Sequence, residues 1–252
     1  MFDKKLLKNI DWVFITFVFI LLGVSLIVLA SASSNVVENQ PYYYLKRQSL
    51  WIAMGLVVIF ILILFDYRNL QKFIKPIYII MILMLIGVLF MPEQKGAHRW
   101  YDLGFMDFQP SELAKIITII CFAAFLVKRQ DVIDKWSTFF LCFVVVGIPM
   151  GLVLIEPDLG SSLVFFAILI AMMWIGGIPK KRMIVFLLIV LGLVIFVFVD
   201  LYFATDGFQH LATDLPIPLP LKTYQLMRLI IFINPEMDPL DTGYHIIQSQ
   251  VA

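Results

Sequence analysis

Charged side chains are scarce in this sequence. Lys, Arg, Asp and Glu make up 15% of the 252 residues, whereas a soluble domain carries about 25%. At the same time, 62% of the residues are hydrophobic. One water-soluble core cannot bury that much apolar surface, so the composition predicts a protein for which lipid is much of the solvent. The net charge of +1 excludes a nucleic-acid-binding surface built on bulk positive charge.

Cysteine and histidine are also few. Cys121 and Cys142 lie inside apolar stretches, where we expect small buried hydrophobic side chains rather than a disulfide. His98, His210 and His245 are scattered along the chain without the spacing of a metal site. The sequence therefore predicts neither a disulfide framework nor a metal-binding motif.

Long apolar runs are abundant. Seven stretches, each near 17 residues or more with their flanks, are long enough to cross a bilayer: Trp12–Ala32, Leu50–Phe65, Ile74–Met91, Leu113–Val127, Thr138–Ile155, Gly160–Ile178 and Met183–Phe203. Within lipid a helix satisfies its own backbone hydrogen bonds, so each stretch is predicted to be helical. The expected fold is an all-α polytopic membrane protein, with a seven-span bundle over 1–203 and a separate segment over 204–252.

The distribution of Lys and Arg predicts the orientation of this bundle. The Trp12–Leu29 run is longer than the apolar part of a signal peptide, so we expect an uncleaved first span. With a cytoplasmic amino terminus, the inner segments hold 12 of the 19 basic residues, the outer segments hold six, and Lys115 lies within a span. The positive-inside rule thus favours a cytoplasmic amino terminus and an extracytoplasmic 204–252 segment.

The 204–252 segment differs from the rest of the chain. Alternate prolines at 216, 218 and 220 exclude a regular helix there, and the stretch 234–244 is rich in turn residues. The sequence reaches Ala252 in the middle of a pattern. We therefore expect this segment to be an extracytoplasmic loop that is truncated.

The first group of residues that could carry chemistry surrounds the start of the fourth apolar stretch. Pro110 suits the first turn of a helix, and Glu112 in that turn suits the helix dipole. Lys115 shares a face with Glu112 and lies about one turn inside the membrane, where an ionisable side chain is expensive. Arg99 and Trp100 precede this helix. Glu112 and Lys115 form either a structural ion pair or part of a site for a charged substrate.

The second group, Glu156-Pro-Asp-Leu-Gly160, joins the fifth and sixth apolar stretches. Asp158 is well placed as the amino-terminal cap of the following helix, and capping alone could account for it. The predicted topology puts both groups on the outer face, so Arg99, Glu112, Lys115, Glu156 and Asp158 could converge on one cavity. Cations there could bind a phosphate or pyrophosphate, and a carboxylate could act as a base or hold a divalent cation.

Two glycines are predicted to mark a close helix contact. Gly147 and Gly151 flank Pro149 with the small-xxx-small spacing that lets two membrane helices approach.

These motifs resemble the family of shape, elongation, division and sporulation proteins, the multi-span proteins of bacterial wall synthesis. The matching stretches lie in the family's order and cover the whole chain: Ala97-His-Arg-Trp100, Gln109-Pro-Ser-Glu-Leu-Ala-Lys115, Glu156-Pro-Asp-Leu-Gly160, and Asn234-Pro-Glu-Met-Asp-Pro-Leu-Asp-Thr-Gly-Tyr244 with Gln248-Ser249. Within the family, the 243–249 stretch is more similar to the rod-shape branch than to the division branch.

The resemblance implies a peptidoglycan glycosyltransferase of the bacterial plasma membrane, acting in cell elongation and shape. Such a protein polymerises lipid II, carried on undecaprenyl pyrophosphate, together with a class B penicillin-binding protein. On this model Arg99 and Lys115 contact the pyrophosphate or substrate, and Trp100 shapes the cavity. Glu112 and Asp158 position these groups. The cofactor stays open, with a divalent cation as the candidate.

One departure from the family pattern concerns the catalytic residue. Family members have about ten spans, and the aspartate regarded as catalytic lies beyond the position of Ala252, so the catalytic residue is unknown here. We expect an incomplete chain that does not polymerise glycan alone. Two other functions stay open, a flippase for a lipid-linked precursor and a non-catalytic scaffold of the wall-synthesis complex.

Overall fold

The computed structural model describes residues 11–33, 42–64, 72–92, 98–104 and 107–204, together with 231, 234–235 and 247–249. The chain divides into two compact units, Met1–Gln71 and Lys72–Ala252. Nearly all of the 204–252 segment lies outside the described residues, so its predicted loop character and the predicted domain boundary at 203 stay predictions.

Unit 1 contributes two apolar helices, α2 (Trp12–Ala32) and α3 (Tyr43–Leu64). The Asp11 carboxylate caps α2 by accepting a hydrogen bond from the Phe14 N–H at 3.0 Å. No residue of α2 is buried, as expected for a helix whose solvent is lipid. The helix α3 begins at Tyr43 rather than at the predicted Leu50, because its polar first turns continue the helix beyond the apolar run.

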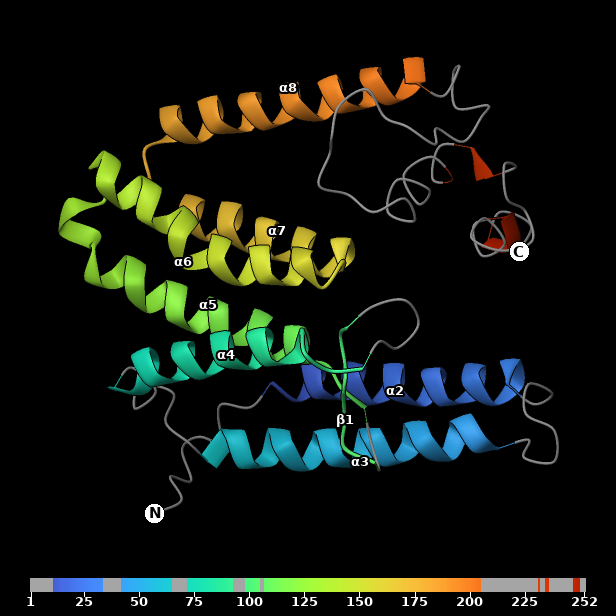
Figure 1. The fold of residues 1–252 in the computed structure, drawn as a ribbon. Helices are drawn as coiled ribbons and strands as arrows, with labels where there is room; N and C mark the ends of the chain where they lie inside the picture. Colours follow the sequence, from blue (N-terminus) through green and yellow to red (C-terminus); the bar gives the residue numbers. More distant parts are fainter. Residues whose placement is uncertain are drawn as a thin grey trace. The chain divides into compact units, whose positions relative to one another are not determined.

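Unit 2 contributes five long α-helices, a short 3-10 helix (Gln130–Val132) and a small β-hairpin among its described residues (Figure 1). The helices pack mainly as the pairs α4 with α5 and α6 with α7, and α5 also contacts α6 and α7. Short connections between α5, α6 and α7 make sequential neighbours antiparallel. The elements are α4 (Ile74–Val88), β1 (Tyr101–Asp102), β2 (Asp107–Phe108), α5 (Pro110–Lys128), α6 (Trp136–Ile155), α7 (Leu159–Ile175) and α8 (Lys180–Ala204).

All seven predicted apolar stretches are helical, which confirms a polytopic helical membrane protein. Among the described residues, α2, α3, α5, α6 and α8 are long and apolar enough to cross a membrane. The other two are shorter, with 15 residues in α4 and 17 in α7. The predicted end of the third stretch at Met91 is wrong by one turn, because α4 ends at Val88 and tight turn bonds follow it.

The core of unit 2 lies where α4, α5, α6 and α7 meet. Leu85, Phe122, Val146 and Phe165, one from each helix, are completely buried. The predicted burial of both cysteines is confirmed. By contrast, only 6% of the residues in the most apolar stretch of α8 are buried. The four central helices therefore form the packed core of the unit.

A proline inside α6 explains one contact that fixes α4 against this core. Pro149 has no N–H, so the Val145 carbonyl four residues earlier loses its helical donor. The Tyr78 hydroxyl on α4 donates to that carbonyl at 2.8 Å. An orphaned polar group in an apolar core is costly, and this bond removes the cost while joining the two helices.

The predicted close contact at Gly147 and Gly151 is wrong. A Cβ atom built at either glycine meets no atom of the described residues within 4 Å. The two glycines leave space beside α6 instead of admitting a neighbouring backbone.

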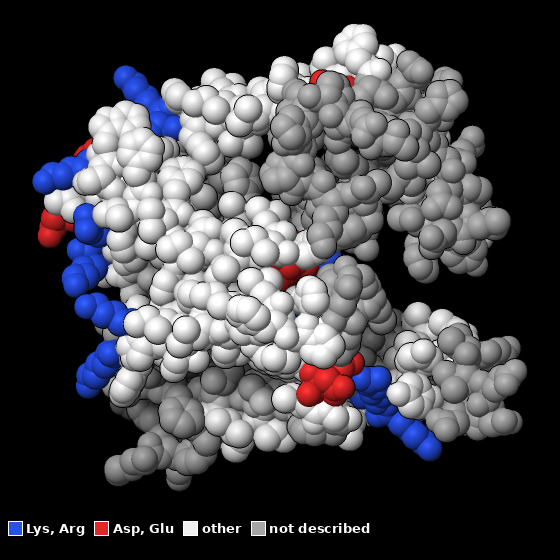
Figure 2. Space-filling model, in the orientation of Figure 1, with Lys and Arg blue, Asp and Glu red and all other residues white. Residues whose placement is uncertain are grey.

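The two ends of unit 2 carry different side chains. We call one end, which holds the start of α4 and the α5–α6 and α7–α8 connections, the basic end. Its cations are Lys72, Lys75, Lys128, Arg129, Lys135, Lys180, Lys181 and Arg182. Figure 2 shows Lys and Arg side chains gathered along its left edge. The opposite end, which holds the β-hairpin and the α6–α7 turn, is called the hairpin end. Its described cations are Arg99 and Lys115, and its described acids include Glu112, Glu156 and Asp158.

Candidate functional site

The β-hairpin holds the first predicted site residues against the helices. Tyr101 pairs with Phe108 across the two antiparallel strands, and their rings stack with centroids 6.5 Å apart. The Tyr101 hydroxyl donates to the Met84 carbonyl of α4 at 2.9 Å. Residues 99 and 100 directly precede this hairpin and Gln109 directly follows it, so the hairpin brings both flanks to the same end of the bundle.

Arg99 connects this segment to the α6–α7 turn. Its Nε–H donates to the Glu156 carbonyl at 3.0 Å, and its Nη2 donates to the Pro157 carbonyl. These carbonyls follow the last turn of α6, where a helix leaves acceptors unsatisfied and favours a cation. Part of the guanidinium is thus committed to the protein itself. Its predicted contact with a substrate stays a prediction.

Asp158 caps α7, as the sequence predicted. Its carboxylate accepts a hydrogen bond from the Ser161 N–H at 3.0 Å and another from the Ser161 hydroxyl at 3.0 Å. The Gln109 side-chain amide also donates to this carboxylate, at 3.2 Å. Asp158 therefore links the start of α5 to the start of α7, in addition to capping the helix.

Glu156 is the most unusual residue at the hairpin end. Its side chain is fully buried, and neither carboxyl oxygen has a hydrogen-bond partner among the described residues. Burial and the nearby Asp158 carboxylate raise the pKa of Glu156 to about 8, against the opposing effect of Arg99. The carboxyl group is therefore mostly protonated and uncharged at neutral pH.

Glu112 and Lys115 form the ion pair predicted from their spacing. The Lys115 ammonium lies 2.8 Å from a Glu112 carboxylate oxygen. Pro110 starts α5, and Glu112 lies in its first turn. The side chain of Glu112 is 59% exposed, whereas that of Lys115 is 21% exposed. The pair places a half-buried cation near the amino-terminal end of α5.

The structure thus joins some of the predicted residues directly. Arg99, Glu156 and Asp158 belong to one network around the α6–α7 turn, whereas Glu112 and Lys115 bond to each other. Trp100 is half-buried beside Arg99. Sequence reasoning missed Gln109 and Ser161, which complete the Asp158 network. The capping position of Asp158 was the available signal, since a capping carboxylate needs a backbone donor three residues later.

A divalent cation finds no complete ligand set in the described part of the chain. No group of three or more His, Cys, Asp or Glu side chains there could hold a metal ion.

Comparison with known proteins gives a consistent result. A family model described as "Cell cycle protein", which covers FtsW, RodA and SpoVE, matches residues 11–252. The chain is similar to "Probable peptidoglycan glycosyltransferase FtsW" of Geobacter sp. (strain M18), with 30% identity over 97% of this chain and 63% of the relative. The protein of the same description from Haemophilus influenzae is 28% identical, with 97% of this chain and 57% of the relative covered. The chain thus spans about 60% of the length of these relatives.

Solved structures share the fold. A structure described as "Structural coordination of polymerization and crosslinking by a peptidoglycan synthase complex" has a TM-score of 0.66 and 29% identity, and the match covers 94% of this chain and 64% of that one. The Thermus thermophilus rod shape determining protein RodA has a TM-score of 0.60 and 24% identity, over 89% of this chain and 74% of that one. Because the family model covers almost all of the sequence, the chain belongs to the FtsW, RodA and SpoVE family of cell cycle proteins.

Proposed function

We propose that this chain belongs to a peptidoglycan glycosyltransferase that polymerises lipid II. The observation that carries the proposal is the family match over residues 11–252, together with curated relatives described as peptidoglycan glycosyltransferases. The hairpin end supports it chemically, because cations and carboxyls are gathered there at one end of a membrane-embedded bundle.

In this proposal the cations of the hairpin end act on the leaving group. The acceptor hydroxyl of one sugar attacks the anomeric carbon of the donor sugar, and the lipid pyrophosphate leaves with its negative charge. Lys115, held at 2.8 Å by Glu112, stabilises that charge from the membrane side. Arg99 and Trp100 line the proposed substrate site beside Lys115. Asp158 holds Gln109 and the start of α7 in place. The proton of the acceptor hydroxyl passes to a general base, which is none of these residues.

The proposal is tested by measuring glycan strands from lipid II in proteoliposomes that contain the full-length gene product, with and without a class B penicillin-binding protein. K115A should reduce polymerisation about 100-fold or more, the cost of removing one electrostatic stabiliser. K128A, which removes the same charge at the basic end, should not. No glycan under either condition would contradict a polymerase. Transfer of labelled lipid II across the bilayer without glycan would indicate a flippase, and partner binding alone a scaffold.

A class B penicillin-binding protein is the partner that we propose for this chain. The structural relative at TM-score 0.66 is described as part of a complex that coordinates polymerization and crosslinking. Co-purification of tagged chain with the partner from membranes tests the pairing. Whether the partner acts in elongation or in division decides between the rod-shape and division branches. The curated relatives named above are described as FtsW.

The chain is a multi-pass protein of the inner membrane, and we propose that its amino terminus and basic end are cytoplasmic. The unequal cation content of the two ends of unit 2 supports this orientation. Asp102 and Asp131 are exposed at opposite ends. A membrane-impermeant maleimide should label D102C in cells with a permeabilised outer membrane and D131C only after the inner membrane is opened. The reverse pattern would invert the topology and move residues 204–252 to the cytoplasm.

A further inference from the structure

An aromatic groove opens at the basic end of unit 2, away from the residues discussed so far. It lies between the start of α6 and the start of α8 and has a volume of about 520 Å³. Its lining is almost entirely apolar apart from two cations at one end: Trp136, Phe139, Phe140, Phe143, Lys181, Arg182, Val185, Phe186 and Ile189. This volume lies within the range of pockets that bind small molecules.

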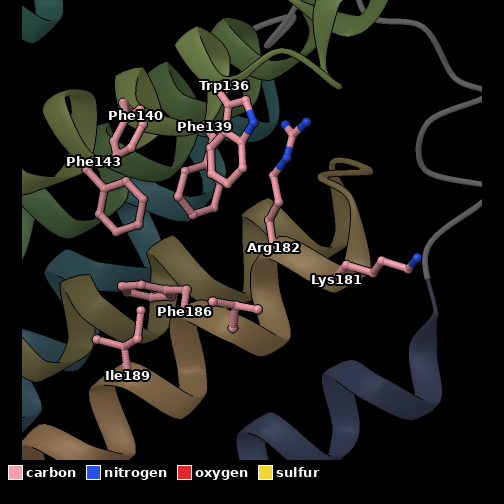
Figure 3. A pocket seen from close by; sticks show the side chains of 9 residues that line it. Trp136, Phe139, Phe140, Phe143, Lys181, Arg182, Phe186 and Ile189 are labelled. Carbon is pink, nitrogen blue, oxygen red and sulfur yellow. The ribbon is translucent and has the colours of Figure 1, made fainter.

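The groove lies at the surface of the described residues rather than in the core. Phe140 is 61% exposed, and Val185 and Ile189 are each 57% exposed. In Figure 3 the phenylalanine rings and Ile189 lie along α6 and α8 in the direction away from Trp136. Such a surface offers hydrocarbon contacts over its length, which a lipid chain can make.

The mouth of the groove carries an unsatisfied cation. The Arg182 guanidinium lies over the Trp136 ring, 4.4 Å from its centroid (Figure 3). The Arg182 Nη1 atom is shielded from solvent and has no hydrogen-bond partner among the described residues. Buried donors are almost always paired, and a guanidinium pairs best with a phosphate or carboxylate oxygen.

The charges around Arg182 favour an anion as that acceptor. The first turn of α8 contains Lys180, Lys181 and Arg182 and no acidic residue. Cations at the amino-terminal end of a helix are disfavoured by its dipole, and a bound anion relieves this. Within the described part of the chain, neither Lys181 nor Arg182 has an ion-pair partner.

We infer that the groove binds one anionic phospholipid of the bilayer, with its phosphate on Arg182 and Lys181 and an acyl chain along the phenylalanines. Basic pockets between membrane helices are known to take phosphate head groups, and the apolar groove below the cations matches the chain. The site is distinct from the hairpin end and does not depend on the proposed enzymatic function. Lipid binding at this site would make the packing of α6 and α8 depend on the lipid composition of one leaflet.

Native mass spectrometry of the full chain tests this inference. The protein is purified in detergent and supplied with phosphatidylglycerol or with phosphatidylcholine of the same acyl chains. One phosphatidylglycerol should stay bound and phosphatidylcholine should not. K181Q/R182Q should weaken phosphatidylglycerol binding about 25-fold, at about fivefold for each cation. K128Q/R129Q removes the same charge at the same end without touching the groove and should bind as the parent does.

A second variant tests the acyl-chain part of the site. V185W fills the groove from an exposed position, so it should fold normally and lose the lipid while keeping both cations. Equal retention of both lipids, or unchanged retention in either groove variant, would overturn the inference. Displacement of the lipid by millimolar inorganic phosphate would also overturn it in favour of a simple anion site. A parent protein that binds no phosphatidylglycerol would overturn the inference as well.

Discussion

The basic end and the hairpin end of unit 2 use their charges in opposite ways. At the hairpin end, Arg99 and Asp158 bond to the protein, and Glu156 is buried without charge. At the basic end, most cations are exposed and, among the described residues, none forms an ion pair. At the hairpin end, a single substitution should therefore disturb several residues that are bonded to one another. At the basic end, a single substitution should affect little beyond the substituted side chain.

The largest expected contrast is in the pH dependence of stability. The raised pKa of Glu156, about 8 against 4.5 for the free group, means that the folded protein keeps a proton that the unfolded chain loses. Stability should therefore be full below about pH 4.5 and fall as the pH rises to about 8, by on the order of 1 kcal/mol per pH unit. Thermal melts of E156Q should lose this slope.

The groups that face Glu156 are Asp158 and Arg99, and Tyr101 lies close enough for its own pKa to be raised by burial and by Glu156. D131N, which removes an exposed carboxyl at the basic end, is the matched control and should keep the parent slope. A parent whose melting temperature is unchanged from pH 5 to pH 8 would show that Glu156 is not neutral in the fold.

Removing one arginine at each end gives the next largest contrast. R99A deletes the two hydrogen bonds that the Arg99 guanidinium donates to the Glu156 and Pro157 carbonyls, which should cost about 3 kcal/mol. R129A deletes only a cation–π contact with Phe125 and should cost about 1 kcal/mol or less. Denaturation in detergent, followed by tryptophan fluorescence, measures both. Equal losses would remove the distinction between the two ends.

A third test asks whether the helices between the ends depend on a specific bond. Y78F should cost about 1–2 kcal/mol, because the Val145 carbonyl loses its donor. In a P149A background the new N–H at position 149 can bond to that carbonyl, so Y78F should then cost much less. The coupling in this double-mutant cycle checks the explanation. Additive losses would mean that Tyr78 acts only through packing.

The smallest expected effect comes from adding one methyl group. A Cβ atom at Gly87 would lie 2.4 Å from the Tyr101 hydroxyl, so G87A should displace Tyr101 and its bond to Met84 at a cost of about 1 kcal/mol. G147A has open space and improves helix propensity, so it should be neutral or stabilising. Thermal midpoints that move in the same direction would contradict this placement of Tyr101.

Local patterns predicted much of the candidate site. The position of Pro110 at the start of α5, the Glu112–Lys115 pair and the Asp158 cap follow from spacings of three residues or fewer, and all three are confirmed. A helix fixes the geometry of such neighbours wherever it lies in the fold. The Gly147–Gly151 prediction failed because small side chains permit a close contact but do not supply the neighbour.

The sequence by itself determined that seven apolar segments are helical, because backbone groups in lipid must be satisfied within each segment. Because Pro149 lies inside α6, it leaves the Val145 carbonyl without a helical donor. Only the tertiary structure decided that Tyr78 supplies this donor, that Arg99 bonds to carbonyls 57 and 58 residues away, and that Glu156 is buried. These contacts depend on which helices pack together, and many pairings of apolar helices satisfy the same apolar pattern.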